Sequence, residues 1–349
     1  MDVLAIRLLS QQLAVPQYSK PEEVVSHFGA VQAQEYRLMR WAVAMRTKKP
    51  SIGAFETAYN SGRIVRLHLL RGTWHLVAAE DYNWMLKLCG RKGMNVIKGW
   101  MKSNGISIPD DEHAMVNDAL VQIVGERGCV TCEDIENALA DMNIRMDRHR
   151  LSYHIRMAEY EGLLCSGDLH PMKATYSLVS HKIKTEATSD MMHEEMLALL
   201  ARKYFRSHSP ATLEDFVWWS GLSVSECRNA IASLGHELFC ETWHGQTFYI
   251  HESCRMRRIR ANRIHLLPSY DEYLIGYKSR GYAIPHEFQH RVHSNNGIFF
   301  PVIVRDGRVC GNWKPFVKDL QTDYFCDGMT GCGDDVEAWN RYKQYLRQL

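Results

Sequence analysis

The 349-residue chain is predicted to be an α+β protein with three tandem winged-helix modules followed by a small β-rich C-terminal domain. Three observations support this prediction. Helical patterns followed by short hairpins recur, a helix-capping motif repeats after about 80 residues, and the pattern becomes strand-like near residue 264. The predicted modules are residues 1–108, 109–188 and 189–262, and the C-terminal domain is residues 263–349.

The first module carries a helical pattern that ends in a hairpin. Pro21 suits the first turn of a helix, and Glu22 and Glu23 follow it at the positive end of the helix dipole. Ser51 is placed to cap another helix. The pattern predicts helices at residues 4–15, 21–28, 38–45 and 51–59, and strands at 64–70 and 73–77 around Arg71-Gly72.

The next two modules repeat this order. The segments starting at Thr131 and Thr212 each place an aspartate three residues later, as in a capping box. Helices are expected at residues 115–124, 148–162, 194–204 and 223–234, and two more are expected to begin at Thr131 and Leu213. Strands are expected at 162–165, 174–179, 237–241 and 246–250, the last two around a turn at His244-Gly245. In the last domain, strands are expected at 264–268, 298–304 and 309–313, with a hairpin turn at Asp306-Gly307 and a helix at 335–346.

Composition restricts the class of protein. Hydrophobic residues make up 46% of the chain, which excludes a disordered protein. Ten cysteines are scattered along a chain with no secretory leader, so a reduced, cytoplasmic protein is expected. No apolar run approaches the roughly 20 residues that span a bilayer, which argues against a membrane protein.

Basic residues are grouped although the net charge is only +2. The group consists of Arg255, Arg257, Arg258, Arg260 and Arg263. Such a group is compatible with a nucleic-acid-binding face and with a solvated surface. Three winged helices in tandem favour a DNA-binding scaffold.

Two glutamines, Gln32 and Gln34, lie in an apolar segment between two predicted helices. Gly29 resembles a helix C-cap, so the pair is expected near a helix terminus, where backbone amides are free to bind. From these residues alone, a structural cap and a binding site both remain open.

Four segments together resemble the AlkZ-like bacterial DNA glycosylases. They are residues 32–34, 71–77, 266–276 and 305–313, and they occur in the family's order. The resemblance implies that three winged helices and a C-terminal β-barrel form a clamp on duplex DNA. It also implies a bacterial, nucleoid-associated enzyme of base excision repair that removes N7-alkylated guanines, and some members unhook interstrand crosslinks.

The family's catalytic signature maps onto Gln32 and Gln34. The related YcaQ-like enzymes carry aspartate at the second position, where this chain has Gln34. Alkylation at N7 makes the guanine cationic and weakens the glycosidic bond, so the leaving group needs little acid catalysis. A glutamine carbonyl accepts a hydrogen bond from water and places partial negative charge near C1′. An amide is a poor general base, so neutral adducts are expected to be poor substrates.

The first predicted hairpin supplies candidate phosphate contacts. They are Arg66, His68, Arg71 and His75, and Arg37 is a further candidate. As structural residues, those of the hairpin would instead pair with nearby carboxylates.

The C-terminal hairpin is the second candidate DNA contact. Arg305 and Arg308 flank its turn, and Lys314 lies at the end of its second strand. A solvated hairpin is the alternative. Asp271 is a candidate for orienting a catalytic side chain.

No cofactor or metal is expected. Cys129 and Cys132 lack a second close pair, and Cys326 and Cys332 lack a histidine pair, which argues against zinc. No glycine-rich phosphate loop is present. The predicted protein is a monomeric, monofunctional glycosylase acting on alkylated guanine in double-stranded DNA. The alternative is a non-catalytic winged-helix regulator in which the glutamines are structural.

Overall fold

The computed structural model describes residues 1–184, 191–254, 259, 263–326 and 333–347. The chain forms two compact units. The first unit combines residues 1–55 with residues 197–349, and the second comprises residues 56–196. The chain is therefore a mixed α/β protein whose first unit is discontinuous in sequence.

The N-terminal part of the first unit is mostly helical, as predicted. It contains α1 (Val3–Ser10), α2 (Pro21–Phe28), the short strand β1 (Ala30–Gln32) and α3 (Met39–Ala44), and α4 (Ile52–Asn60) leads into the second unit. The first helix is shorter than expected because Gln12 adopts a positive φ of 59°. The Gln12 side-chain oxygen accepts a hydrogen bond from the Gln17 backbone at 2.9 Å, which stabilises this turn.

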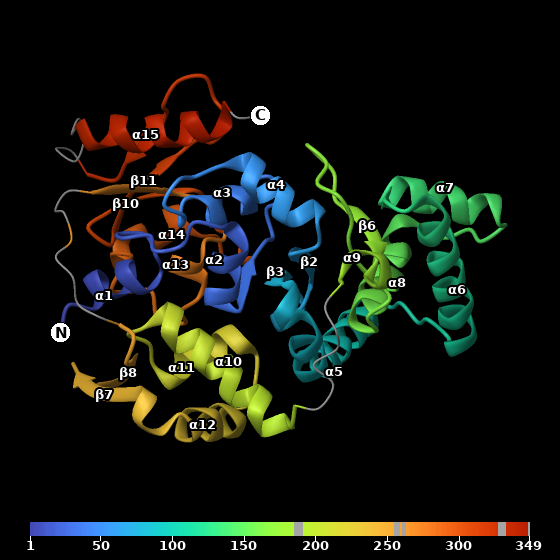
Figure 1. Cartoon of the computed structure of the whole chain (residues 1–349), viewed down its shortest axis with the longest axis horizontal. Coiled ribbons are helices and arrows are strands. Elements are labelled where there is room, and N and C mark those ends of the chain that lie inside the picture. Colours follow the sequence, from blue (N-terminus) through green and yellow to red (C-terminus); the bar gives the residue numbers. More distant parts are fainter. Residues whose placement is uncertain (185–190, 255–258, 260–262, 327–332, 348–349) are drawn as a thin grey trace. The chain divides into compact units, whose positions relative to one another are not determined.

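Three helices and a hairpin follow in the same unit (Figure 1). They are α10 (His193–His208), which begins in the second unit, α11 (Leu213–Ser220), α12 (Val224–Ser233), β7 (Leu238–Trp243) and β8 (Gln246–His251). Thr212 caps α11 by accepting the Asp215 amide at 3.1 Å. The predicted hairpin turn at His244-Gly245 is confirmed, with φ values of 48° and 73°. These elements match the sequence pattern.

The C-terminal strands form an open antiparallel sheet with the order β12-β11-β10-β9. Its strands are β9 (Ile264–Leu267), β10 (Val302–Arg305), β11 (Arg308–Trp313) and β12 (Thr322–Tyr324). Within the described residues β12 pairs with β11 and β9 with β10, so the expected barrel-like closure is wrong. Helices, rather than strand closure, cover the sheet. Short α13 (Glu272–Ile275), a 3-10 turn (His286–Phe288) and α14 (Gln289–Val292) connect β9 to β10, and α15 (Gly333–Leu346) ends the unit.

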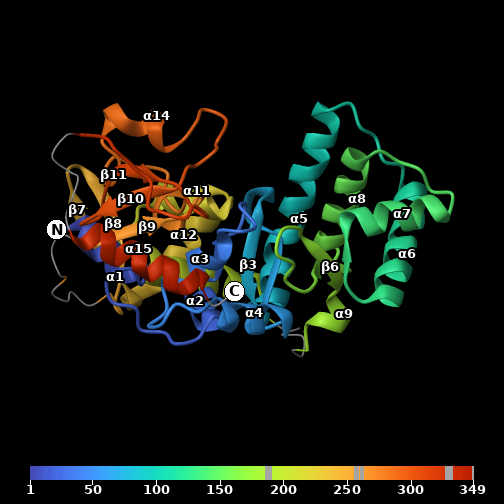
Figure 2. The same ribbon diagram turned by 90° about the horizontal axis from the view of Figure 1, so that it is seen from above.

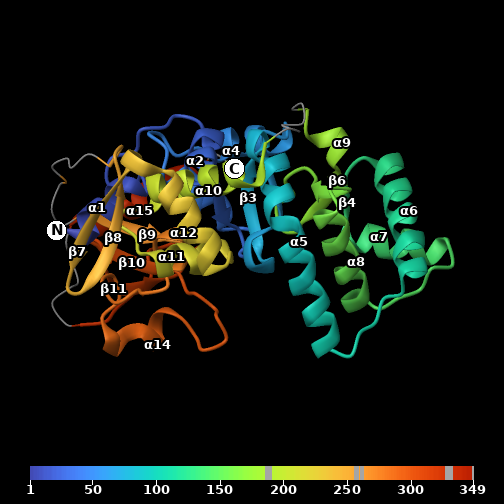
Figure 3. The ribbon, with the colours of Figure 1, turned by 90° about the horizontal axis from the view of Figure 1, so that it is seen from below.

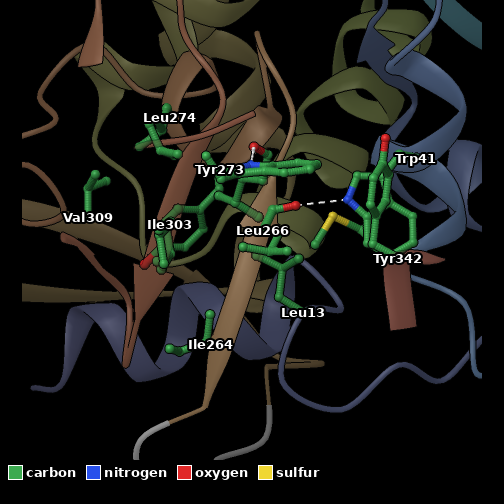
Figure 4. Close-up of a cluster of buried hydrophobic side chains, with 14 of the residues drawn as sticks. Leu13, Trp41, Ile264, Leu266, Tyr273, Leu274, Ile303, Val309 and Tyr342 are labelled. Carbon is green, nitrogen blue, oxygen red and sulfur yellow. Dashed lines mark hydrogen bonds between the residues drawn. The ribbon is translucent and has the colours of Figure 1, made fainter. Parts of the chain in front are cut away.

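One hydrophobic core joins both sequence segments of the first unit. The Trp41 indole N–H of α3 donates to the Leu266 carbonyl of β9 at 2.8 Å, and its ring lies against Tyr342 of α15 (Figure 4). Trp313 of β11 donates to the Leu267 carbonyl at 2.8 Å. This core packs the N-terminal residues with the C-terminal sheet. The four-part division of the chain stays a prediction.

In the second unit, α4 is followed by the hairpin of β2 (Ile64–His68) and β3 (Trp74–Ala78), which confirms the predicted pair. A 25-residue helix that the sequence pattern did not indicate, α5 (Ala79–Ser103), follows and lies beside α8 (Arg148–Tyr160) (Figure 3). Its glycines lower its intrinsic helix propensity. At Gly93 they serve packing, because a Cβ there would lie 2.1 Å from the Tyr160 ring.

The rest of the second unit combines helices with a small sheet (Figure 2). The elements are α6 (Asp110–Arg127), β4 (Val130–Thr131), α7 (Cys132–Asp141), α8, β5 (Leu164–Ser166), β6 (Thr175–Leu178) and α9 (Val179–Lys182). The strand order is β4-β6-β5. Thr131 and Asp134 form the predicted capping box. The strand β4 was not expected, because two residues are too few to show a period.

Part of the basic group lies outside the described residues, namely Arg255, Arg257, Arg258 and Arg260, as does Cys332. The predicted boundaries at residues 188 and 262 also fall there. Arg263 is described, and its guanidinium donates to the Ala14 carbonyl. In the described part of the chain, no helix has the length and apolar character needed to cross a bilayer.

Two glycines with positive φ provide a matched pair for testing the β10–β11 turn. At Gly307 (φ 85°) a Cβ would lie 2.7 Å from Leu4 Cβ, whereas at Gly297 (φ 76°) it would meet open space. We expect Gly297→Ala to cost about 1 kcal/mol of the free energy of unfolding, from backbone strain alone. Gly307→Ala should cost roughly 1–3 kcal/mol more through overpacking. Urea denaturation of both variants measures the difference, and equal losses would contradict the packing of the turn.

The buried His265 of β9 predicts acid sensitivity. Burial, together with nearby arginines, lowers its pKa to about 3. The unfolded chain then binds a proton below about pH 6.5 that the folded chain does not, so stability falls as the pH drops. Between pH 7 and pH 5 this residue should remove about 2 kcal/mol from the free energy of unfolding. In His265→Leu the loss over this range should be smaller by that amount. Parallel pH dependence in wild type and variant, followed by urea denaturation, would contradict this origin.

Candidate active site

The glutamine segment begins where α2 ends. Gly29 has a φ of 80°, and its amide donates to the Val25 carbonyl at 3.0 Å. The chain then enters β1, so Gln32 lies near the C-terminus of α2, as expected, and ends a short strand. Gln32 is buried and Gln34 is exposed. Of the two predicted catalytic residues, Gln34 is therefore the one whose side chain reaches the surface.

A buried carboxylate holds the backbone of this segment. The Gln32 amide donates to Glu272 Oε1 at 2.6 Å. The other oxygen, Oε2, accepts from Trp219 Nε1 at 3.1 Å and lies 3.2 Å from His208 Nε2. Burial lowers the pKa of His208, so the neutral ring donates its Nε2 hydrogen. Three N–H donors converge on one carboxylate, which favours its ionised form.

Glu272 was not among the residues singled out from the sequence. It lies inside the motif at residues 266–276, next to the predicted supporting residue Asp271. The available signal was a second carboxylate directly before the apolar run Tyr273-Leu274-Ile275. A charged side chain among buried residues requires partners. Which partners it has depends on long-range contacts that the pattern does not contain.

Asp271 supports the neighbouring helices. Its two oxygens accept from the Arg46 guanidinium at 2.7 and 2.9 Å, and Oδ1 also caps α13 through the Tyr273 amide at 2.9 Å. Arg46 in turn donates to the Gln11 and Ala42 carbonyls at 3.0 and 2.7 Å. The described contacts thus connect Asp271 to the glutamine segment through the adjacent Glu272. A direct contact with a catalytic side chain stays a prediction.

Arg37 lies three residues after Gln34, on the loop that leads to α3. Its guanidinium carbon is 3.7 Å from the centre of the Phe316 ring, a cation–π contact. Phe316 is partly exposed, and Lys314 nearby in sequence is exposed. Arg37 and Lys314 are both in the first unit with the glutamines.

The β10–β11 turn packs against other elements of the first unit. The Tyr273 hydroxyl donates to the Gly307 carbonyl at 2.8 Å, and the turn packs against Leu4 of α1. Arg305 is directed toward the Asp335 carboxylate at 3.8 Å. Arg308 is exposed. The absence of a side chain at Gly307 allows this packing. Of the two arginines, Arg308 is exposed and Arg305 is partly exposed and directed toward Asp335.

The candidate phosphate contacts of the first hairpin lie in the second unit, and three are buried. The Arg66 guanidinium stacks on Trp74 at 3.8 Å. His68 Nδ1 is 2.5 Å from Glu159 Oε2. Burial raises the pKa of Glu159 to about 8 and lowers the pKa of His68, so both groups favour their neutral forms. His75 Nδ1 donates to the Thr73 carbonyl at 2.8 Å. His68 thus pairs with a carboxylate, as the structural alternative required, whereas Arg66 contacts an aromatic ring and His75 a backbone carbonyl.

Arg71 is different from the other three residues. It lies in the 3-10 turn (Leu70–Gly72) between the two strands, with a φ of 55°, and it is partly exposed. A non-glycine residue with positive φ is uncommon and marks a turn of fixed shape. Arg71 therefore remains the candidate of this hairpin for a phosphate contact.

Comparison with known families decides the assignment. A family model described as "DNA glycosylase AlkZ-like" matches residues 25–320, which include the glutamine segment and the Glu272 motif. The chain belongs to the AlkZ-like DNA glycosylases. It is thus a member of an enzyme family, and the resemblance drawn from its four sequence segments is confirmed.

Two further matches, one by sequence and one by structure, extend the comparison for this AlkZ-like chain. An interstrand DNA cross-link repair glycosylase of Streptomyces sahachiroi is 23% identical over 340 residues, covering 93% of this chain and 90% of the relative. The solved structure of Streptomyces sahachiroi DNA glycosylase AlkZ matches with a TM-score of 0.80 at 21% identity, covering 99% of this chain and 95% of that one. At this identity the structural match establishes the fold.

Among the residues that the structure describes, no group of three or more histidine, cysteine, aspartate or glutamate side chains is placed to hold a metal ion.

The buried and exposed arginine–aspartate pairs of this protein should differ in energetic value. Arg46 and Asp271 are both buried, whereas the Arg291–Asp323 pair has an Asp323 side chain that is 69% exposed. Asp271→Ala leaves a buried guanidinium without its carboxylate, and we expect a loss of about 3–5 kcal/mol in the free energy of unfolding. Asp323→Ala should cost about 0–1 kcal/mol. Chemical denaturation compares the two, and similar losses would contradict a structural role for Asp271.

Proposed function

We propose that this protein is a monofunctional DNA glycosylase that hydrolyses the N-glycosidic bond of cationic N7-alkylated guanine in duplex DNA, without a cofactor. The observation that carries the proposal is the family's Gln-x-Gln segment, in which Gln34 is exposed and the Gln32 backbone is bonded to a buried carboxylate. An exposed amide next to a fixed backbone is able to orient a water molecule against a bound nucleotide.

The chemistry suits two amides. The alkylated base leaves as a neutral purine, so the positive charge moves from the base toward the sugar as the bond breaks. The side-chain oxygen of Gln34 accepts a hydrogen bond from the attacking water. The side-chain amide of Gln32 adds a second dipole in the same segment, which stabilises the positive charge that develops on the sugar. Neither residue ionises, so the proposed site avoids the cost of desolvating a charged side chain in contact with DNA.

The scaffold is proposed to bind DNA through three winged-helix modules, residues 1–108, 109–188 and 189–262, and a C-terminal domain, residues 263–349. Each of the three contains helices followed by a hairpin. Arg37, Arg71, Arg308 and Lys314 are the proposed phosphate contacts with at least partly exposed side chains. We further propose a cytoplasmic, nucleoid-associated monomer.

Crosslink repair is a proposed extension of this activity. The Streptomyces sahachiroi relative carries the description interstrand DNA cross-link repair glycosylase. An interstrand crosslink through guanine N7 contains the same cationic glycosidic bond as a simple adduct. The same two amides would therefore release one end of such a crosslink.

Substitution of the glutamines tests the proposal. We expect Gln34→Ala to lower the single-turnover rate constant for release of N7-methylguanine at least 100-fold, and Gln32→Ala to lower it by a similar or smaller factor. An oxyanion-hole-type dipole is worth about 100- to 1,000-fold in rate. Alkaline strand cleavage of the treated duplex measures the abasic sites. The Kd for the duplex, measured by fluorescence anisotropy, should stay within about threefold because the phosphate contacts are unchanged.

Gln17→Ala is the matched control, because Gln17 is an exposed glutamine of the same unit outside the segment. Its release rate should equal that of the wild type. Release at the wild-type rate by the Gln32→Ala/Gln34→Ala double variant would overturn the catalytic assignment. A wild-type protein that binds the duplex and leaves no abasic sites would instead support the non-catalytic regulator.

A further inference from the structure

Glu272 connects the short α13 to the candidate catalytic segment. Its side chain is 1% exposed, and its Oε1 accepts the Gln32 backbone amide at 2.6 Å. We propose that Glu272 is a positioning residue for base excision, whose carboxylate fixes the backbone of Gln32 and thereby the placement of Gln34. This inference rests on the function proposed above and adds a residue to it.

Loss of the hydrogen bond between the Gln32 amide and Glu272 would cost enough free energy to change the conformation of the glutamine segment. Gln32 lies at the end of a three-residue strand, and the next residue with an exposed side chain is Gln34. A buried N–H that loses its acceptor costs about 1–3 kcal/mol. Without Glu272 the segment would therefore rearrange to find another acceptor. The amide groups of both glutamines would move with it.

A carboxylate suits this place better than an amide. Its two oxygens meet N–H donors from Gln32, Trp219 and His208. A glutamine at this position would present an NH₂ group to at least one of these donors. A carboxylate meets all three, and a charge-assisted bond is about twice as strong as a neutral one.

Charged and titratable groups surround this carboxylate on several elements. His208 of α10 donates to it, and Arg46, which follows α3, is paired with Asp271 next to it in the chain. Tyr277 accepts a hydrogen bond from Gln11 and donates to the His208 carbonyl at 2.9 Å. These contacts hold the carboxylate in one orientation before any substrate binds.

The supporting contacts also fix α13 itself. The Tyr204 hydroxyl donates to the Gly276 carbonyl at 3.0 Å, and Trp218 donates to the Ile275 carbonyl at 3.1 Å. At Gly276 a Cβ would lie 2.6 Å from the His208 ring, so helix α10 packs closely against this turn. A catalytic group displaced by about 1 Å loses about 100-fold in rate. The contacts that fix Glu272 therefore also fix the Gln32 backbone, and their loss would lower the rate of base excision.

Burial excludes direct contact between Glu272 and DNA in this structure. A residue that acts only by placing the glutamines should change the rate of the chemical step and leave DNA affinity unchanged. A residue needed only for stability should change neither, once the variant is folded. The ratio of these two effects separates the roles.

The test compares Glu272→Gln with Asp215→Asn in the full-length protein. Asp215 is a matched control because it is also a buried carboxylate of the first unit, and it accepts the Thr212 and Lys278 amides instead of Gln32. We expect Glu272→Gln to lower the single-turnover rate constant on N7-methylguanine duplex at least tenfold, with the Kd within about twofold. Asp215→Asn, assayed under conditions in which the variant is folded, should retain the wild-type rate constant within about twofold.

A second variant and a second readout complete the test. Glu272→Asp keeps the charge but is one methylene too short to reach the Gln32 amide, so it should slow excision as well. Residue-resolved hydrogen exchange should show a protected Gln32 amide in the wild type and faster exchange in both variants. This readout does not require activity.

The outcomes distinguish the two proposals. An active wild type together with unchanged rates in a folded Glu272 variant would overturn the positioning role. A loss of rate matched by an equal loss of DNA affinity would also overturn it. A wild type that excises nothing would refute the proposed function, and the exchange of Gln32 would still show whether Glu272 holds the strand.

Discussion

The hydrogen bond between the Gln32 amide and the Glu272 carboxylate is the contact on which the candidate site depends. It joins a strand near residue 32 to a helical turn near residue 272, so it exists only because the first unit is assembled from both parts of the chain. A buried carboxylate must be matched by donors, and here the donors come from a strand, from α10 and from α11. Folding of the unit and assembly of the site are therefore one process.

The hydrophobic core of the first unit, together with a buried ion pair, also fixes the position of the glutamine segment. Trp41 of α3 bonds to β9, and Arg46 after α3 bonds to Asp271 next to Glu272. The helix that follows the glutamines is thus anchored to the element that carries the carboxylate. Both ends of the segment are attached to the C-terminal sheet and its connections. This arrangement favours a preorganised site over one that forms on binding.

Local patterns predicted most of the secondary structure. Capping residues such as Thr131, Thr212 and Ser51 and the turn at Asp306-Gly307 are local signals, and they marked the correct element boundaries to within a few residues. Helix α5 was missed because its glycines lower the local helix propensity, and the close contact of Gly93 with the Tyr160 ring is a tertiary contact that local propensity does not contain. The sheet was expected to close like a barrel, but among the described residues its order is β12-β11-β10-β9, with β12 and β9 at the edges. Strand patterns predict the strands themselves and do not predict whether the edge strands pair with each other.

The candidate site was predictable in its chemistry and less so in its geometry. Gln32 and Gln34 were identified by their motif, whereas Glu272 was not, because its three donors come from elsewhere in the chain. Arg66 and His68 alternate on one strand as phosphate contacts would, yet Trp74 and Glu159 take them into the interior. Alternation along a strand predicts which side chains share a face of the sheet, but it does not predict whether that face is buried or exposed.

The central claim is that two amides suffice because the leaving group is already cationic. The most direct measurement compares release of N7-methylguanine and of neutral O6-methylguanine from otherwise identical duplexes by the wild-type protein, under single-turnover conditions. The account predicts abasic sites from the N7-methylguanine duplex and none above background from the neutral lesion. Equal release of both bases, or release of neither, would contradict it.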